Sequence, residues 1–96
     1  MASNISVTPD QLRQESTHVV TKAGDARTEF GALRTRLLGL EAMFTGAAQD
    51  KFQERYTEWD THAKGLVDAL EGLGKFLETA ATTLEDTDNQ LAQGLS

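Results

Sequence analysis

The side chains able to do acid–base chemistry gather in one stretch of the sequence. Two carboxylate pairs, Glu54 with Glu58 and Glu58 with Asp60, are candidates for acid–base work, and a helix would bring the first pair close together because its members are four residues apart. Cations alternate with these acids in the same stretch, at Lys51, Arg55 and Lys64. Alternating charges predict a solvated helix face with ion pairs, and no Ser-His-Asp order or glycine-rich loop accompanies them. We therefore expect a protein that is not an enzyme.

The capacity of the sequence for metal binding is small. It has two histidines, His18 and His62, far apart in the chain, and no cysteine. Transition metals are held by clusters of His and Cys side chains rather than by single ones. The lack of cysteine also excludes a disulfide. We expect no metal and no other cofactor.

Charge and hydropathy argue against a nucleic-acid partner and against a membrane-spanning segment. The 96 residues carry a net charge of −6, which disfavours binding to a nucleic-acid backbone. No apolar run approaches the roughly 18 residues of a transmembrane helix. The first residues, MASNISVTPDQL, lack the basic start and apolar block of a cleavable signal peptide. We expect one small domain with no transmembrane segment, no signal peptide and no nucleic-acid partner.

Two helices account for most of the chain. Ala, Leu, Glu, Gln, Lys and Arg dominate, which favours an all-α fold. Thr8, Pro9 and Gln11 form the pattern of a helix start with a capping box. We predict a first helix over 8–41, a turn over 42–46, a second helix over 47–86 and a flexible tail over 87–96. The tail is expected to fray because no cation follows Lys75, whereas four acids do and oppose the helix dipole, namely Glu78, Glu85, Asp86 and Asp88.

Apolar and small residues recur four and three positions apart in both halves, as in a coiled coil. The predicted core residues are Leu12, Val19, Phe30, Leu33 and Leu37, then Phe52, Tyr56, Trp59, Leu66, Leu70 and Leu77. In an antiparallel hairpin, facing residue numbers have a constant sum, and here Phe30 with Trp59 and Val19 with Leu70 both give 89. A single continuous helix fits the same spacing but leaves Gly46 unexplained, so the hairpin is favoured.

A single two-helix hairpin has too little interior to be stable alone. Apolar residues remain outside the predicted core, namely Val20, Leu38, Met43, Val67 and Phe76. Glycines that would permit close approach of another backbone flank it, at Gly24, Gly31, Gly65 and Gly72. We therefore expect two hairpins to dimerise into an elongated four-helix bundle.

The sequence LEAMFTGAAQDKF over 40–52, followed by Trp59, resembles the WXG-100 family of ESAT-like substrates of type VII secretion. The turn motif is Phe44, Thr45 and Gly46, with Phe where the family usually has Trp. The resemblance implies export from the cytoplasm as a folded dimer, with itself or a co-secreted relative, through an FtsK/SpoIIIE-type secretion ATPase. Phe44 fits two roles, a core residue or a half-exposed part of a binding surface.

The family's second signature is a C-terminal Tyr-Xaa-Xaa-Xaa-Asp/Glu export element. No Tyr follows Tyr56, and the corresponding positions are Leu84 and Asp88. The resemblance therefore implies an export signal at Leu84 and Asp88, on one helix face beyond the start of the first helix. The alternative function is a cytosolic coiled-coil adaptor or chaperone-like protein that is not exported, in which this tail is a frayed end.

Overall fold

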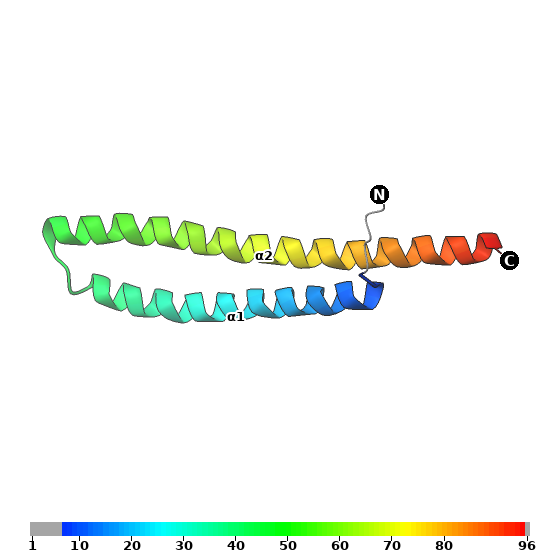
Figure 1. Cartoon of the computed structure of the whole chain (residues 1–96). Helices are drawn as coiled ribbons and strands as arrows, with labels where there is room; N and C mark the ends of the chain where they lie inside the picture. Colours follow the sequence, from blue (N-terminus) through cyan, green and yellow to red (C-terminus); the bar gives the residue numbers. More distant parts are fainter. Residues whose placement is uncertain (1–6, 96) are drawn as a thin grey trace.

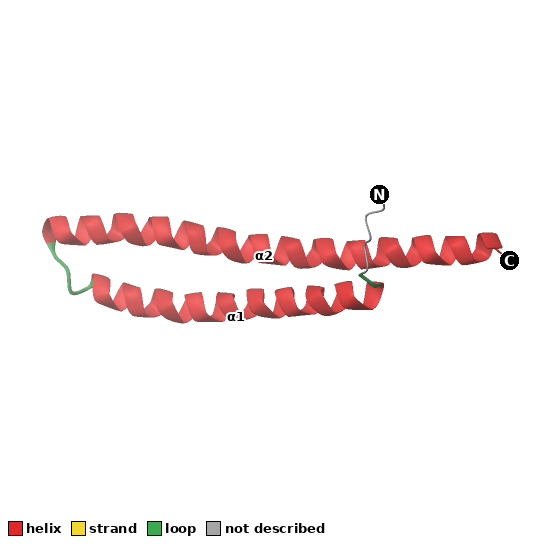
Figure 2. Ribbon diagram, viewed as in Figure 1, coloured by secondary structure: helices red, strands yellow, loops and turns green. Residues whose placement is uncertain are grey.

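The computed structural model describes residues 7–95, which form two antiparallel helices joined by a short turn (Figure 1). Helix α1 spans Pro9–Glu41 and helix α2 spans Gly46–Leu95. The described residues contain no strand, as Figure 2 shows. The molecule is a thin rod of 75 × 25 × 16 Å. The expected all-α hairpin is therefore confirmed, and the single continuous helix is excluded.

Helix α1 begins with a complete capping box. The Thr8 hydroxyl accepts a 3.1 Å hydrogen bond from the backbone N–H of Gln11, and the Gln11 side chain accepts one of 2.8 Å from the Thr8 N–H. Pro9 occupies the first helical position, where its missing N–H costs nothing. These local interactions fix where α1 starts, and so how far it reaches along α2.

The turn depends on one glycine. Backbone N–H groups of Met43 and Phe44 donate to the carbonyls of Leu40 and Glu41 at 2.9 and 3.1 Å, which closes the last turn of α1. Gly46 then has φ +61°, and no other described residue has positive φ. Residues with a Cβ are strained in that region, so Gly46 lets the chain reverse and begin α2.

Helix α2 is longer than the sequence predicted. It was expected to end near residue 86, and instead it continues to Leu95. Residues 75–93 contain neither Gly nor Pro, so nothing in that stretch interrupts helical hydrogen bonding. Two of the acids expected to fray it, Glu78 and Glu85, pair with Arg13 of α1. The flexibility of residues 87–96 stays a prediction, and Ser96 lies outside the described residues.

The line of contact between the helices is made of small residues. The buried positions are Ser16 and Ala23 in α1, with Ala63, Val67, Gly74 and Ala81 in α2. The Ser16 hydroxyl donates a 2.7 Å hydrogen bond to the Gly74 carbonyl oxygen. No large side chain among the described residues is fully buried. The helices therefore approach closely, and the larger residues lie beside the contact line rather than on it.

This arrangement places the predicted core residues in two groups. Leu33 and Leu66 are 38% and 51% exposed in the hairpin. The others are half-buried: Leu12, Val19, Phe30, Leu37, Phe52, Tyr56, Trp59, Leu70 and Leu77. The four-three spacing selected Leu66, but Val67, one residue later, is the buried residue at this point. Leu33 and Leu66 belong to a core only if a second molecule covers them.

The aromatic contact expected from the register is present. The rings of Phe30 and Trp59 meet edge to face, with centroids 5.8 Å apart and an interplanar angle of 83°. A contact between Val19 and Leu70 stays a prediction. A Cβ added at any of the four glycines expected at a close approach to a second hairpin would meet no atom of the opposite helix within 4 Å: Gly24, Gly31, Gly65 and Gly72. Gly74 is the glycine at the helix–helix contact instead.

Candidate functional site: two faces, a turn and a C-terminal arm

Each helix carries ion-pairing residues one position after large apolar ones. The adjacent pairs are Leu33–Arg34, Trp59–Asp60, Leu70–Glu71, Leu77–Glu78 and Leu84–Glu85. One position is a rotation of about 100° around a helix axis. When two antiparallel helices pack against each other, a step of one residue along either chain turns the side chain from the contact toward the same side of the hairpin. The hairpin therefore has an ion-pair face and an opposite apolar face.

The ion-pair face joins the two helices by salt bridges. Its members are Arg13, Arg27 and Arg34 in α1, with Asp60, Lys64, Glu71, Glu78 and Glu85 in α2. Asp60 accepts from Arg34 and lies 3.0 Å from Lys64 Nζ. Hydrogen bonds from these two cations hold the pKa of Asp60 below its usual 3.8. The guanidinium of Arg34 also lies 5.7 Å from the centre of the Trp59 ring.

The apolar face carries large side chains that the hairpin leaves uncovered. Leu33, Leu66 and Leu73 are 38%, 51% and 48% exposed. Trp59, Leu70, Leu77 and Leu84 complete this face and are half-buried. Large contiguous apolar surface on a small soluble protein usually marks an interaction site.

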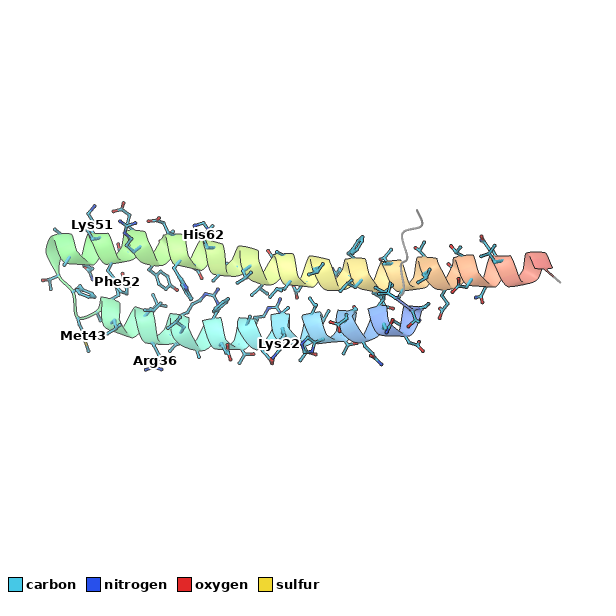
Figure 3. All side chains as sticks on the ribbon, viewed as in Figure 1. Lys22, Arg36, Met43, Lys51, Phe52 and His62 are labelled. Atoms are coloured by element: carbon cyan, nitrogen blue, oxygen red, sulfur yellow. The ribbon has the colours of Figure 1, made fainter. Side chains whose placement is uncertain are left out.

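Of the acids and cations that suggested chemistry, Asp60 and Lys64 belong to the ion-pair face, and the other four lie elsewhere. Glu54 and Glu58 pair with Lys51 and Arg55 on the same helix, at 3.8 and 3.3 Å, and all four side chains are largely exposed. This is the solvated face that the alternating charges predicted, and Figure 3 shows Lys51 directed outward. Both histidines are exposed, and residues 7–95 contain no cluster of His, Cys, Asp or Glu suited to a metal. Neither described helix is long and apolar enough to cross a bilayer.

The turn presents two apolar side chains at one end of the rod. The Phe44 ring stacks on Phe52, with centroids 5.1 Å apart, and Phe44 is still 39% exposed. Met43 is 79% exposed and lies on the outside of the turn in Figure 3. Phe44 thus packs on a neighbouring ring and stays partly exposed, and its part in a binding surface stays a prediction.

At the other end, α2 extends past the start of α1 (Figure 1). Ala81 is fully buried, and Leu84 and Glu85 are half-buried. Leu84 was expected to be almost uncovered, but it is half-buried in the hairpin. From residue 86 to 91 every residue is exposed, including Asp88, and Leu91 is 62% exposed. We call residues 86–95 the C-terminal arm.

The base of this arm is attached to α1 by Arg13, a contact that the sequence interpretation missed. The guanidinium donates to both oxygens of the Glu85 carboxylate, at 2.9 and 3.0 Å, and lies 3.6 Å from Glu78. These hydrogen bonds lower the pKa of Glu85 and raise that of Arg13. Glu78 and Glu85 are seven residues apart on one helix face, a signal that could have suggested a shared partner.

Comparison with known proteins identifies this hairpin. The profile of WXG100, described as proteins of 100 residues with WXG, matches residues 4–89. The chain belongs to the WXG100 family. It is 31% identical to the ESAT-6-like protein EsxB of Corynebacterium diphtheriae over 94 residues, covering 96% of this chain and 90% of that protein. It is 27% identical to Protein YukE of Bacillus subtilis over 92 residues, covering 96% and 95%.

Solved structures agree with this WXG100 assignment. A crystal structure of the secreted protein EsxB from Bacillus anthracis superposes with a TM-score of 0.79 at 26% identity, covering 92% of this chain and 95% of that one. EsxA of Geobacillus thermodenitrificans gives 0.78 at 28% identity, covering 96% and 99%. In this WXG100 chain the turn reads Phe44-Thr45-Gly46, with Phe in place of the Trp for which the family is named.

Proposed function

We propose that this protein is a substrate of a type VII secretion system, exported as a folded dimer through a signal in the last part of α2. Membership of the WXG100 family, with an ESAT-6-like relative and a neighbour described as secreted, supports this proposal. The observation that carries it is the arm: a helical extension beyond the hairpin that is exposed over residues 86–91 and presents Asp86, Asp88 and Leu91 there.

The signal consists of Leu84 and Asp88, which lie four residues apart and so on one face of α2. Leu84 is half-buried at the base of the arm, and Asp88 is exposed. A partner therefore has access to a carboxylate and to an apolar surface that continues to Leu91. A membrane-anchored FtsK/SpoIIIE-type ATPase is the partner that reads this surface in our proposal. Before export the protein resides in the cytoplasm, and it leaves without a cleavable signal peptide.

The dimer forms through the apolar face. Exposed Leu33, Leu66 and Leu73 supply the surface that a second hairpin would bury, and burial of apolar area is the main driving force for association. The ion-pair face is already neutralised by salt bridges within one hairpin, so it offers less to a second copy. We propose a homodimer, with a co-secreted WXG100 relative as the other partner to be tested.

The second candidate function is a cytosolic adaptor or chaperone-like protein that remains in the cell. The apolar face favours it as much as it favours a secreted dimer, because both functions require binding to another helical protein. The arm distinguishes them, since an adaptor has no need of an exposed helical extension.

The deciding experiment measures the protein in culture medium and in cells of a host with an active type VII secretion system. The full chain is compared with a chain that ends at residue 81, and with a full chain carrying Asp68→Ala, which removes an exposed acid away from the arm. Export of the full chain and of Asp68→Ala, with retention of the truncated chain, supports the proposal. Equal retention of all three in the cell, with folded protein present, favours the adaptor.

A further inference from the structure

The cation nearest to the arm comes from the other end of the sequence. Arg13 lies in the second turn of α1, and 72 residues separate it from Glu85. Its guanidinium binds both oxygens of the Glu85 carboxylate and lies 3.6 Å from Glu78. A forked arginine–carboxylate pair fixes orientation as well as distance, because two parallel hydrogen bonds form together. The first turns of α1 thereby hold α2 at the point where the arm begins.

The end of α2 needs such a cation. After Lys75 it contains no Lys or Arg, whereas four acids follow: Glu78, Glu85, Asp86 and Asp88. Negative charge near a helix C-terminus opposes the helix dipole and promotes fraying. No basic residue occupies the last turn of α2. By its own composition this segment should lose helix, which is why the sequence predicted an end near residue 86.

We propose that Arg13 is a positioning residue for the arm, and that its pairing with Glu85 and Glu78 keeps residues 86–95 helical only while the hairpin is closed. The biological meaning of this inference rests on the proposed function. The effect of Arg13 on the helicity of the arm does not depend on that function. A partner that binds the arm as a helix would thereby distinguish a folded hairpin from an unfolded chain, since an open chain separates Arg13 from Glu85.

The test is residue-resolved amide hydrogen exchange on the purified protein, comparing Arg13→Gln with Arg27→Gln. Arg27 pairs with Glu71 across the same two helices, far from the arm, so it controls for the general loss of one interhelical ion pair. Because exposed ion pairs are weak, we expect exchange in residues 86–91 to rise about two- to fivefold in Arg13→Gln. In Arg27→Gln it should stay at the wild-type rate. Equal exchange rates in the two variants would overturn the inference.

Salt provides a second, independent measurement. In 1 M NaCl the Debye length is about 3 Å, so the charge effect of Arg13 on the arm should be screened. The difference in arm exchange between Arg13→Gln and wild type should then fall to less than half of its low-salt value. A difference that is unchanged by salt would mean that Arg13 acts through packing, which would contradict the inference.

Export assays separate this inference from the proposed function. Faster arm exchange together with reduced export of Arg13→Gln supports both. Faster arm exchange with normal export of both Leu84→Ala and Asp88→Ala would overturn the export signal and leave the role of Arg13 standing. Unchanged arm exchange in Arg13→Gln, with export lost in Asp88→Ala, would overturn the role of Arg13 and leave the export signal standing.

Discussion

The Ser16 hydroxyl donates a 2.7 Å hydrogen bond to the Gly74 carbonyl oxygen, joining the two helices at a position where α2 has no side chain. A Cβ built on Gly74 would lie 2.6 Å from Val20 Cγ2 and 3.5 Å from the Ser16 carbonyl oxygen. The first of these distances is well below van der Waals contact. Both helices therefore depend on a small residue here: glycine in α2, so that the backbones approach, and serine in α1, whose buried hydroxyl finds an acceptor in the Gly74 carbonyl.

Gly74→Ala should lower the free energy of unfolding by about 1–3 kcal/mol, because the added methyl group overpacks the contact. Gly72→Ala is a matched control two residues away, since a Cβ there meets no atom within 4 Å. It should be neutral or stabilising by up to about 1 kcal/mol, the usual gain of Ala over Gly inside a helix. Thermal unfolding of the two variants side by side measures the difference.

Val20→Ala added to Gly74→Ala should recover part of the loss, because it removes the methyl group that a Cβ at position 74 would strike. If the two glycine variants unfold at the same temperature, the close approach at Gly74 does not exist in solution and the register described here is wrong.

The sequence was sufficient to predict the hairpin because the signals for its turn and its first cap are local. Gly46 has the positive φ that a reversal requires, and Thr8 with Gln11 closes a capping box within four residues. The contact between Phe30 and Trp59 also followed from spacing alone, because a single number, the constant sum of facing residue numbers, defines the alignment of two antiparallel helices.

The contact line was missed by one residue in the middle of α2, and the reason is physical. Four-three spacing continued past Ala63 selects Leu66, whereas the structure buries Val67. Helices in close approach instead place Ala, Gly and Ser on the contact line. The Arg13–Glu85 pair was missed because it joins residues 72 positions apart, which no local rule connects.

Acidification should destabilise the hairpin through its ion-pair face. The pKa of Asp60 lies below its usual 3.8 because Arg34 and Lys64 donate to it, and that of Glu85 lies below 4.5 because of Arg13. A lowered pKa in the folded state stabilises the fold above the usual pKa, and this contribution is lost as pH falls through the folded-state pKa. The unfolding temperature should therefore fall as pH drops below about 4.5.

Asp60→Asn tests this directly, because the amide cannot titrate. The variant should be less stable than wild type at pH 7, and the difference should shrink as pH falls below 3.8 and through the lowered pKa of Asp60. Asp68→Asn, which removes an exposed acid eight residues along the same helix, should keep the wild-type pH dependence. Parallel curves for wild type and Asp60→Asn from pH 7 to 3 would show that this ion pair contributes nothing to stability.

The apolar face predicts a dimer at micromolar concentration without any added partner. Leu66→Ser combined with Leu73→Ser should yield a monomer, because both side chains are about half exposed in the hairpin and are available to a second copy. Phe76→Ser is the matched control: Phe76 is 65% exposed but lies two residues from Gly74, on the side of α2 away from α1, and should leave the dimer intact. Sedimentation equilibrium distinguishes these outcomes.

Two results would contradict the homodimer. A stable, fully folded wild-type monomer would show that the apolar face needs no second copy. A wild-type monomer with poor near-UV circular dichroism, which orders on mixing with a second small helical protein, would show that the partner is a heterologous WXG100 chain.

Asp88 offers the cleanest separation of export from stability. Its side chain is exposed on the arm, and removing an acid near a helix C-terminus should leave stability unchanged or slightly raised. Asp88→Ala should nevertheless reduce the amount of protein in the culture medium. Leu84→Ala should also reduce export, but at a cost of about 1 kcal/mol, because Leu84 is half-buried and a fully buried leucine would cost roughly 2–5 kcal/mol. Thermal unfolding and export are measured on the same two variants. If Leu84→Ala unfolds like a core substitution while Asp88→Ala exports normally, Leu84 is structural and the signal lies elsewhere in the chain.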